Sequence, residues 1–449
     1  MSKPVFPRVF TAATLFVVVV FFVLVAAVPR TSAQISDPDR ERAKVMLNEI
    51  KNGIKKNYYD PTFHGVDIDA NFKSAEELLK RATSLGQAFG IIAQTVMSLN
   101  DSHTFFLPPE QTVSSDYGFE ILAVGATCYV SAVKPGSDAE AKGLKPGDKI
   151  LSLNGVTPLR EEIWKINYLY KVLRPQAGFR LTVESADGLR RELAVLAKVR
   201  NDKRKLDFTD DGGGNDIFDA IRQEENADHV NRQRYVESGE DLFIWKMPAF
   251  NLTERAVDDM VDKARKHKGL VLDLRGNGGG AESTLLRMIG NFFDHDINVG
   301  TIKRRNETKP LVAKSRGQNI FTGKLVVLID SESASASEIF ARVIQLEKRG
   351  TVIGDRSAGA VMRGRSHDYQ MGMDTVVWYG VNVTDADIVM SDGKSLEKSG
   401  VIPDTSILPT AQDMTANRDP VLSNAASLIG VFMDPARAGT FFPREWVTK

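Results

Sequence analysis

The chain has 449 residues, enough for two to four domains that each bury their own core. Its 58 lysines and arginines balance 58 aspartates and glutamates, so no basic excess favours nucleic acid and no acidic block suggests a solvating tail. The single cysteine excludes an intramolecular disulfide framework and a cysteine-based zinc site, and we expect neither a metal nor a cofactor.

The N-terminal segment, residues 1–33, predicts an export signal. Lys3 and Arg8 precede an uninterrupted apolar run over residues 12–28, and small residues follow it. This order is typical of a secretory signal, with cleavage expected after Ala33. An uncleaved membrane anchor is the competing interpretation, because the run is at the short end of what spans a bilayer. In either case the rest of the chain is expected outside the cytoplasm, in the periplasm or the extracellular space.

The pattern of apolar and turn residues changes twice in the next part of the chain. Residues 37–112 carry apolar residues at helical spacing and predict an N-terminal helical segment that ends at two prolines. Residues 113–198 show short β runs between turn signals and predict a small β domain. Residues 199–240 are charged and turn-rich and predict a linker. Its acidic glycine loop at 207–216 lacks the ligand spacing of an EF-hand and is interpreted as a solvated connector.

From residue 241 to 412, strands alternate with helices. Near-continuous apolar strands such as KLVVLID, in repeated β–α order, predict a layered α/β core whose sheet is buried on both faces. Residues 413–449 are expected to form a C-terminal extension. The sequence therefore predicts a multi-domain α/β protein.

Four serines alternate in the turn that follows the apolar strand KLVVLID. They are Ser331, Ser333, Ser335 and Ser337. The carboxyl end of a strand that leads into a helix is where α/β proteins expose reactive groups. Ser335 with Glu338 also fits the pattern S-x-x-E, so its hydroxyl could instead cap the following helix. The pattern leaves both roles open.

Two further features are weak when taken alone. The stretch LDLRGNGGG, residues 272–280, lets the backbone approach another group and present amide N–H groups to a phosphate or a developing oxyanion. The phosphate option is weak because neither phosphate-loop pattern is present. His103, in LNDSHTFF, lies where a helix breaks into a loop, and a loop histidine is usually a surface residue.

Together, these features resemble the tail-specific, or C-terminal processing, peptidase family. The stretches SASASEIFARVIQ, VLDLRGNGGG and LNDSHTFFLPPE are similar to that family's core, and the likeness extends over nearly the whole mature chain. The middle segment resembles the family's PDZ domain, with DYGFEI similar to the carboxylate-binding loop. The resemblance implies a crotonase-like α/β peptidase core, a PDZ-like β domain and an N-terminal helical segment.

The resemblance also implies roles for individual residues. Ser335 would be the nucleophile, and the other three serines of the turn would be turn and packing residues. The lysine that the tail-specific branch uses as a base is absent, because Ala360 occupies its position. The chain is also similar to the tricorn-type peptidase core, which implies that His103 is the base, that Ser102 orients it and that Glu397 stands behind Ser102.

Backbone amides complete the implied site. The oxyanion would be held by Ala336 and by Gly278 or Gly279. In the PDZ-like domain, three residues of the carboxylate loop would bind the C-terminus of a polypeptide that adds a strand to the sheet edge. They are Tyr117, Gly118 and Phe119.

The leading hypothesis is an exported serine endopeptidase that captures exposed polypeptide C-termini and cleaves through an acyl-enzyme on Ser335. One rival is an inactive binding or scaffold protein on the same fold, motivated by Ala360. A hydrophobic-ligand carrier is the third hypothesis, and it rests only on analogy with retinoid-binding relatives of the fold. The expected partners are polypeptides and not nucleic acid, with membrane association through residues 12–28 if the signal is retained. The oligomeric state stays open.

Overall fold

The computed structural model describes residues 35–109, 114–200, 233–372 and 376–446. The expected export signal and the acidic loop at 207–216 lie outside the described residues. Within the described ranges, no helix is both long and apolar enough to cross a membrane.

The N-terminal segment is helical, as its apolar spacing predicts. Its helices are α1 Asp37–Asn57, α2 Ile68–Leu79 and α3 Leu85–Met97, with the short η1 Phe63–Gly65 between the first two. The α-helices begin at Ser36, Asp67 and Ser84, whose side chains accept main-chain N–H groups of the first turn. Their apolar faces pack on the strands β1 Phe105–Leu107 and β17 Val377–Met390. The loop between α3 and β1, which contains His103, is thereby held against the core.

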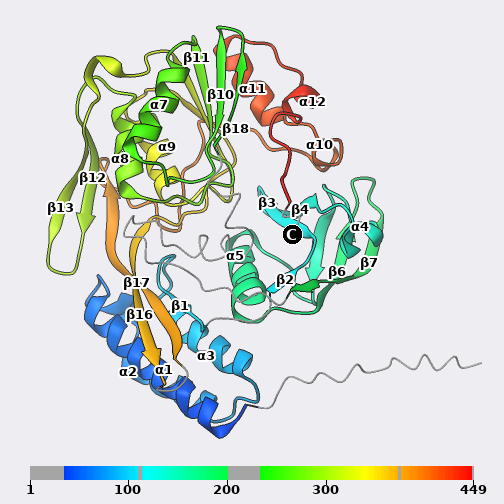
Figure 1. Ribbon diagram of the computed structural model, residues 1–449, viewed down its shortest axis with the longest axis vertical. Coiled ribbons are helices and arrows are strands. Elements are labelled where there is room, and N and C mark those ends of the chain that lie inside the picture. The colour runs from blue at the N-terminus through cyan, green and yellow to red at the C-terminus, as the bar shows by residue number, and fades with distance from the viewer. Residues whose placement is uncertain (1–34, 110–113, 201–232, 373–375, 447–449) are drawn as a thin grey trace, which may run out of the picture. The chain divides into compact units, whose positions relative to one another are not determined.

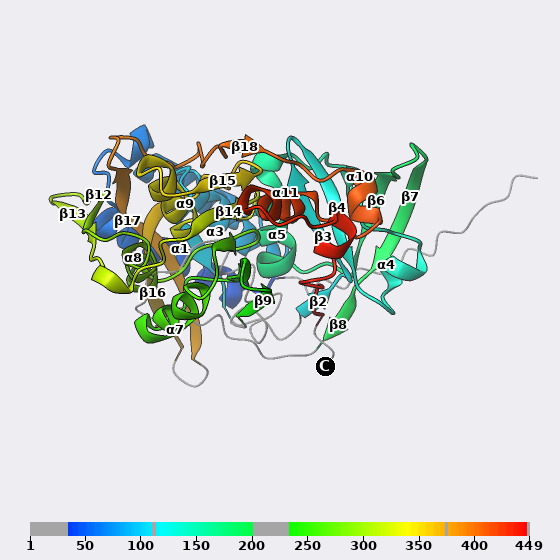
Figure 2. The ribbon, with the colours of Figure 1, turned by 90° about the horizontal axis from the view of Figure 1, so that it is seen from above.

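A β domain follows. Its antiparallel sheet has the order β3-β4-β5-β6-β7, and Figures 1 and 2 show β6 and β7 side by side at one end. The strands are β3 Phe119–Val124, β4 Thr127–Val133, β5 Lys149–Leu153, β6 Gly178–Glu184 and β7 Arg190–Leu196. Short helices accompany the sheet: α4 Asp138–Ala141, η2 Arg160–Glu162, α5 Ile163–Asn167 and η3 Tyr168–Leu173. Strand β2 Ser114–Asp116 pairs with β8 Lys198–Arg200 where the chain enters and leaves the domain.

The α/β core contains a six-stranded sheet in the order β18-β15-β14-β11-β10-β9, parallel except for β9. The strands are β9 Arg234–Ser238, β10 Leu242–Lys246, β11 Gly269–Asp273, β14 Lys324–Ile329, β15 Thr351–Gly354 and β18 Thr405–Ser406. Three helices cover one face: α7 Glu254–Ala264, α8 Glu282–Gly290 and α9 Ala336–Leu346. Helix α11 Pro420–Ile429, within the expected C-terminal extension, covers the other face (Figure 1). Burial on both faces explains why these strands are apolar throughout.

A second sheet joins the core to the N-terminal helices. Its order is β1-β17-β12-β13, with β16 also paired to β17, and all pairs are antiparallel. Its remaining strands are β12 Ile297–Lys303, β13 Thr308–Ala313 and β16 Met362–Met371. The short elements η4 Gly317–Asn319, α10 Ala411–Thr415 and α12 Pro435–Ala438 complete the described chain. The predicted fold class, N-terminal helices with a β domain and an α/β core, is confirmed.

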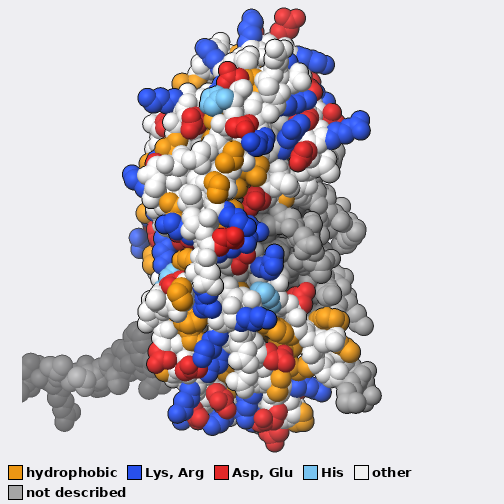
Figure 3. All heavy atoms as spheres, turned by 90° about the vertical axis from the view of Figure 1, so that its left-hand side faces the viewer, with side chains coloured by type: hydrophobic (Ala, Val, Ile, Leu, Met, Phe, Trp, Pro, Cys, Tyr) orange, Lys and Arg blue, Asp and Glu red, His pale blue; other side chains and the backbone are white. Residues whose placement is uncertain are grey.

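Charged side chains are distributed over the surface as the balanced composition predicts. On the face drawn in Figure 3, acidic and basic groups are interspersed, with small apolar areas between them. On this face the described residues form no extended patch of a single charge (Figure 3).

Candidate active site

Ser335 stands at the turn between β14 and α9. It is the N-cap residue of α9, and its backbone has φ 54° and ψ −118°, a conformation that side chains with a Cβ rarely adopt. The predicted capping box with Glu338 is present, and the Glu338 carboxylate accepts the main-chain N–H of Ser335 at 3.1 Å. Strain of this kind at a strand-to-helix turn is typical of exposed nucleophiles.

The other three serines donate their hydroxyl hydrogens to main-chain carbonyls. Ser333 bonds to Leu274 at 2.8 Å, and Ser337 bonds to Asn277 at 2.8 Å. Ser331 reaches Ala123 of the β domain at 2.6 Å. These bonds fit the turn and packing roles expected for the three.

The glycine turn lies directly against Ser335. A Cβ on Gly279, whose φ is +107°, would lie 2.6 Å from the Cβ of Ser335 and 3.0 Å from the main-chain nitrogen of Ala336. Any side chain there would displace the serine turn, so the approach requires glycine. The structure therefore places the glycine turn, which was weak evidence when taken alone, directly against the serine turn.

Asn277, which the sequence analysis missed, ties the two turns together. Its side chain is fully buried, donates to the carbonyl of Met247 at 2.8 Å and accepts the N–H of Gly279 at 2.9 Å. Its own carbonyl accepts the N–H of Ala334 at 3.0 Å and the hydroxyl of Ser337. The Gly279 N–H therefore already has a hydrogen-bond acceptor, the side-chain oxygen of Asn277. Among the described residues, the amides of Gly278 and Ala336 have no hydrogen-bond partner.

The residues expected behind the nucleophile form a hydrogen-bonded chain. The Oγ of Ser102 lies 2.7 Å from Nδ1 of His103 and donates to Oε2 of Glu397 at 2.9 Å. The main-chain N–H of Ser102 donates to Oε1 of the same carboxyl at 2.9 Å. Because the hydroxyl hydrogen is directed at Glu397, the hydroxyl oxygen accepts the hydrogen of Nδ1. Nε2 is then the unprotonated nitrogen of the imidazole.

Residues 360 and 361 connect this chain to Ser335. The carbonyl of Ala360 accepts the Ser335 N–H at 2.9 Å, and the N–H of Val361 donates to Oε2 of Glu397 at 2.9 Å. The side chain of Ala360 is only 3% exposed. The position that a lysine would occupy is therefore beside Ser335 and filled by a methyl group.

Glu338 has a second function that its capping pattern did not predict. Its buried carboxylate accepts the N–H groups of Gly359 and Ala360 at 2.8 and 2.9 Å and the hydroxyl of Ser357. It thus holds the segment beside Ser335 in place. The sequence signal for this role, a glutamate in S-x-x-E, could not be distinguished from ordinary capping.

Burial dominates the electrostatics of the site. Desolvation lowers the pKa of His103 to about 4, against the opposing charge of Asp101. Desolvation raises the pKa of Glu397 to about 8, with a contribution from Asp101, and raises that of Glu338 to about 7. The imidazole is therefore neutral at pH 7. Within the described residues, no group of three or more histidine, cysteine, aspartate or glutamate side chains could hold a metal ion.

We expect the free energy of unfolding to fall as pH rises from about 4.5 to 8. The folded chain keeps the proton of Glu338 up to about pH 7 and that of Glu397 up to about pH 8, whereas the unfolded chain releases both near pH 4.5, so stability is lost between these values. Each contributes a slope of about 1.4 kcal/mol per pH unit within its range. Urea unfolding at several pH values measures the trend. Glu397→Gln, which does not titrate, should show a shallower decline, and equal slopes for both proteins would contradict the assignment.

The expected carboxylate loop forms the entrance to β3. The Gly118 backbone has φ +71°, its N–H donates to Asp116 at 3.1 Å, and its carbonyl accepts the N–H of Lys134 at 2.9 Å. The rings of Tyr117 and Phe119 are buried and line a cavity of about 20 Å³. The cavity is otherwise lined by Ile121, Leu153, Ile166, Asn167, Tyr170, Lys171 and Phe179.

Comparisons with known proteins agree with this architecture. Residues 243–407 match the model of peptidase family S41, and residues 110–161 match the PDZ domain model. The tail-specific protease of Haemophilus influenzae is 26% identical over 323 residues, covering 68% of this chain and 43% of the relative. The carboxy-terminal processing protease CtpA of Bacillus subtilis is 24% identical over 371 residues, covering 80% of this chain and 67% of the relative. The chain thus spans less than half the length of the first relative.

Solved structures share the fold. Mature CPAF superposes with a TM-score of 0.62 at 14% identity, covering 84% of this chain and 94% of that one. The photosystem II D1 C-terminal processing protease superposes with a TM-score of 0.51 at 21% identity, covering 88% of this chain and 99% of that one. The matched models place the likeness in two parts of the chain: residues 243–407 are similar to peptidase family S41, and residues 110–161 are similar to the PDZ domain.

Proposed function

We propose that the chain is an exported serine endopeptidase that cleaves polypeptides recognised by an exposed C-terminus. One observation carries the proposal: the hydrogen-bonded chain Glu397–Ser102–His103, joined to the strained Ser335 through residues 360 and 361. Nucleophile, base and orienting groups are the components that acyl transfer by a serine needs.

In the proposed reaction, Nε2 of His103 takes the hydroxyl proton of Ser335 as Oγ attacks the scissile carbonyl. The amides of Gly278 and Ala336 are the preferred oxyanion donors, because the Gly279 amide already bonds to Asn277. The imidazolium then gives its proton to the leaving amine, and a water hydrolyses the acyl-enzyme. An ionised Glu397 stabilises the imidazolium through Ser102, so kcat is expected to rise with pH through about 8.

The absence of the lysine does not favour the inactive alternative. Ala360 removes an amine from beside Ser335, but a neutral imidazole performs the same proton transfer without a buried charge. Enclosing His103 and Glu397 costs desolvation free energy, and such groups concentrate where proton transfer is needed. This assembly favours an enzyme over a scaffold.

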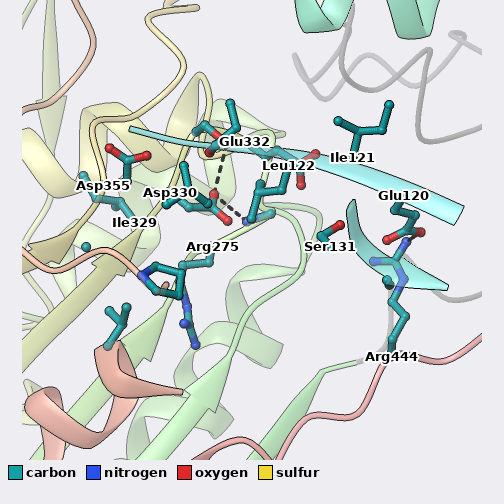
Figure 4. A pocket seen from close by; sticks show the side chains of 18 of the residues that line it. Glu120, Ile121, Leu122, Ser131, Arg275, Ile329, Asp330, Glu332, Asp355 and Arg444 are labelled. Atoms are coloured by element: carbon teal, nitrogen blue, oxygen red, sulfur yellow. Dashed lines mark hydrogen bonds and ion pairs between the residues drawn. The ribbon is translucent and has the colours of Figure 1, made fainter. Parts of the chain in front are cut away.

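A groove leads from the proposed carboxylate loop toward the serine turn. A cavity of about 490 Å³ runs along β3 and α5 to residues 329–332, and Figure 4 shows Asp330 and Glu332 at its core end. It shares Ile121, Asn167 and Lys171 with the small cavity at the loop. Because β3 is the edge strand of its sheet among the described residues, a peptide can pair with it as an added strand. At the end of this edge beside the carboxylate loop, Arg444 of the C-terminal segment points at Glu120.

A matched pair of substrates tests C-terminal recognition. An unfolded polypeptide with a free C-terminal carboxylate is expected to show kcat/KM about 10-fold or more above the same polypeptide with a C-terminal amide, since the amide lacks the charge that the loop binds. Ile121→Asp in the groove should remove the preference, whereas Leu189→Asp on an exposed turn of the same domain should keep it. Equal kcat/KM for the two substrates in the wild-type protein would contradict C-terminal recognition.

Export is the remaining part of the proposal. Removal of residues 1–33 would leave Gln34 as the N-terminus of the mature protein. N-terminal sequencing of the purified native protein distinguishes cleavage from a retained anchor.

A further inference from the structure

Asp101, two residues before His103, is a buried hydrogen-bond centre with no role in the reaction described above. Its side chain is nearly enclosed, with 8% of the residue exposed. Its Oδ1 accepts the main-chain N–H groups of His103 at 3.0 Å and Thr104 at 2.7 Å, and the hydroxyl of Thr384 at 2.7 Å. Its Oδ2 accepts the hydroxyls of Tyr58 at 2.6 Å and Thr104 at 3.0 Å.

We propose that Asp101 is a positioning residue that holds the His103 main chain so that Nδ1 meets Ser102 and Nε2 is presented to Ser335. The inference rests on the proposed function, in which His103 is the base. It concerns orientation, because Asp101 contacts the backbone of His103 while Ser102 contacts the ring.

The loop around His103 needs such a residue because it lies between α3 and β1, outside regular secondary structure. Tyr58 ends α1 and Thr384 belongs to β17, so Asp101 ties the loop to two separate elements. On the other side of the histidine, Asn382 of β17 donates to the carbonyl of His103 at 2.6 Å. Both main-chain polar groups of His103 are therefore fixed by side chains.

An asparagine could not replace this carboxylate without rearrangement. Two of the five donors are amides that cannot rotate, so the oxygen of an asparagine would remain with them and its NH₂ would face Tyr58 and Thr104. The Tyr58 hydroxyl cannot simply turn away. The Nδ1 of His64 lies 2.9 Å from the carbonyl of Leu99 and therefore carries a hydrogen, so it offers Tyr58 no acceptor. A carboxylate is the one side chain of this size that accepts all five bonds.

The charge of Asp101 allows a second test of the inference, through the pH dependence of kcat. Its negative charge adds to the burial that raises the pKa of Glu397, and it opposes the burial that lowers the pKa of His103. The other titratable groups near Asp101 are Tyr58, which caps the end of α1, the neighbouring Tyr59, and, beyond Tyr58, His64 on η1. Removing the charge should therefore move the rise of kcat with pH, assigned to Glu397, to lower pH. A residue that only supports the fold would leave that profile in place.

Asp101→Asn, Asp101→Ala and Tyr58→Phe test the inference in the full-length protein. We expect Asp101→Asn to lower kcat on an unfolded polypeptide about 10-fold and Asp101→Ala about 100-fold, within the range of general-base contributions. KM should stay within about twofold, because the PDZ groove is untouched. Adding Tyr58→Phe to Asp101→Asn should recover part of the loss, since it removes the hydroxyl that faces the new NH₂. Asp187→Asn, on an exposed turn, is the matched control.

The outcomes separate this inference from the proposed function. Asp101→Asn with wild-type kcat and an unmoved pH profile would overturn the positioning role if Ser335→Ala and His103→Ala are inactive in the same assay. Wild-type hydrolysis by those two variants would instead overturn the proposed function itself. If Asp101→Ala does not fold, Asp101→Asn and the double variant with Tyr58→Phe decide the question. A lower melting temperature of Asp101→Asn with unchanged kcat would overturn the inference.

Discussion

Ser335→Ala is expected to lower kcat by about 10⁴-fold or more, the largest effect of any single substitution in the chain. The variant lacks the oxygen that forms the acyl-enzyme, whereas the oxyanion amides and the PDZ groove remain. The effect is measured as the rate at which an unfolded polypeptide with a free C-terminus is hydrolysed. The readout is the disappearance of the intact substrate chain. Affinity for a C-terminal peptide should be unchanged, so the loss should lie in kcat and not in KM.

Ser427→Ala is the matched control, because this serine is exposed on α11 and its hydroxyl bonds only to the preceding turn of the helix. It should retain wild-type kcat. Activity of Ser335→Ala within tenfold of the wild-type protein would contradict the nucleophile assignment and favour the scaffold alternative.

His103→Ala is expected to lower kcat by about 10³- to 10⁴-fold. The substitution removes the group that takes the Ser335 proton, and Ala360 offers no amine in its place. It also leaves the Ser102 hydroxyl with one partner fewer, although that hydroxyl still donates to Glu397. The same hydrolysis assay, with the variant's melting temperature measured alongside, separates lost chemistry from lost folding.

His295→Ala serves as the control for histidine replacement. Its side chain is 66% exposed and pairs with Asp294 on the surface. Wild-type hydrolysis by a folded His103→Ala protein would exclude the histidine as base and direct attention to another proton acceptor.

Much of the fold was predictable because its signals are local. Apolar strands buried on both faces, helical spacing and turn residues all lie within short windows, and they indicated the three structural regions in order. The S-x-x-E pattern at Ser335 predicted the cap that the structure contains. It could not reveal the positive φ of Ser335, which the local pattern does not encode.

The rest of the site depends on contacts between distant parts of the chain. Glu397 meets Ser102 across 295 positions, and this pairing depends on β1 lying next to β17. Asn277 and Asp101 were missed because an asparagine in a glycine turn and an aspartate in a loop are ordinary turn residues by composition. Their importance follows from burial and from the number of donors they accept, and neither property is local.

The junction between the PDZ domain and the core was equally hidden. Asp355, directly after β15, accepts the N–H of Gly125 at 2.8 Å and pairs with Arg160 at 2.7 Å. Both partners belong to a region that the sequence treats as a separate domain. Composition and periodicity locate domains, but the specific bonds between them depend on the folded surfaces.

Covalent labelling of the native protein tests the central claim most directly. A fluorophosphonate reacts with a serine whose proton is taken by a positioned base, and peptide mass analysis locates the adduct. The account predicts one adduct, on Ser335, that forms in the wild-type protein and is lost in folded His103→Ala. Absence of an adduct on Ser335, or equal labelling of Ser335 with and without His103, would contradict it.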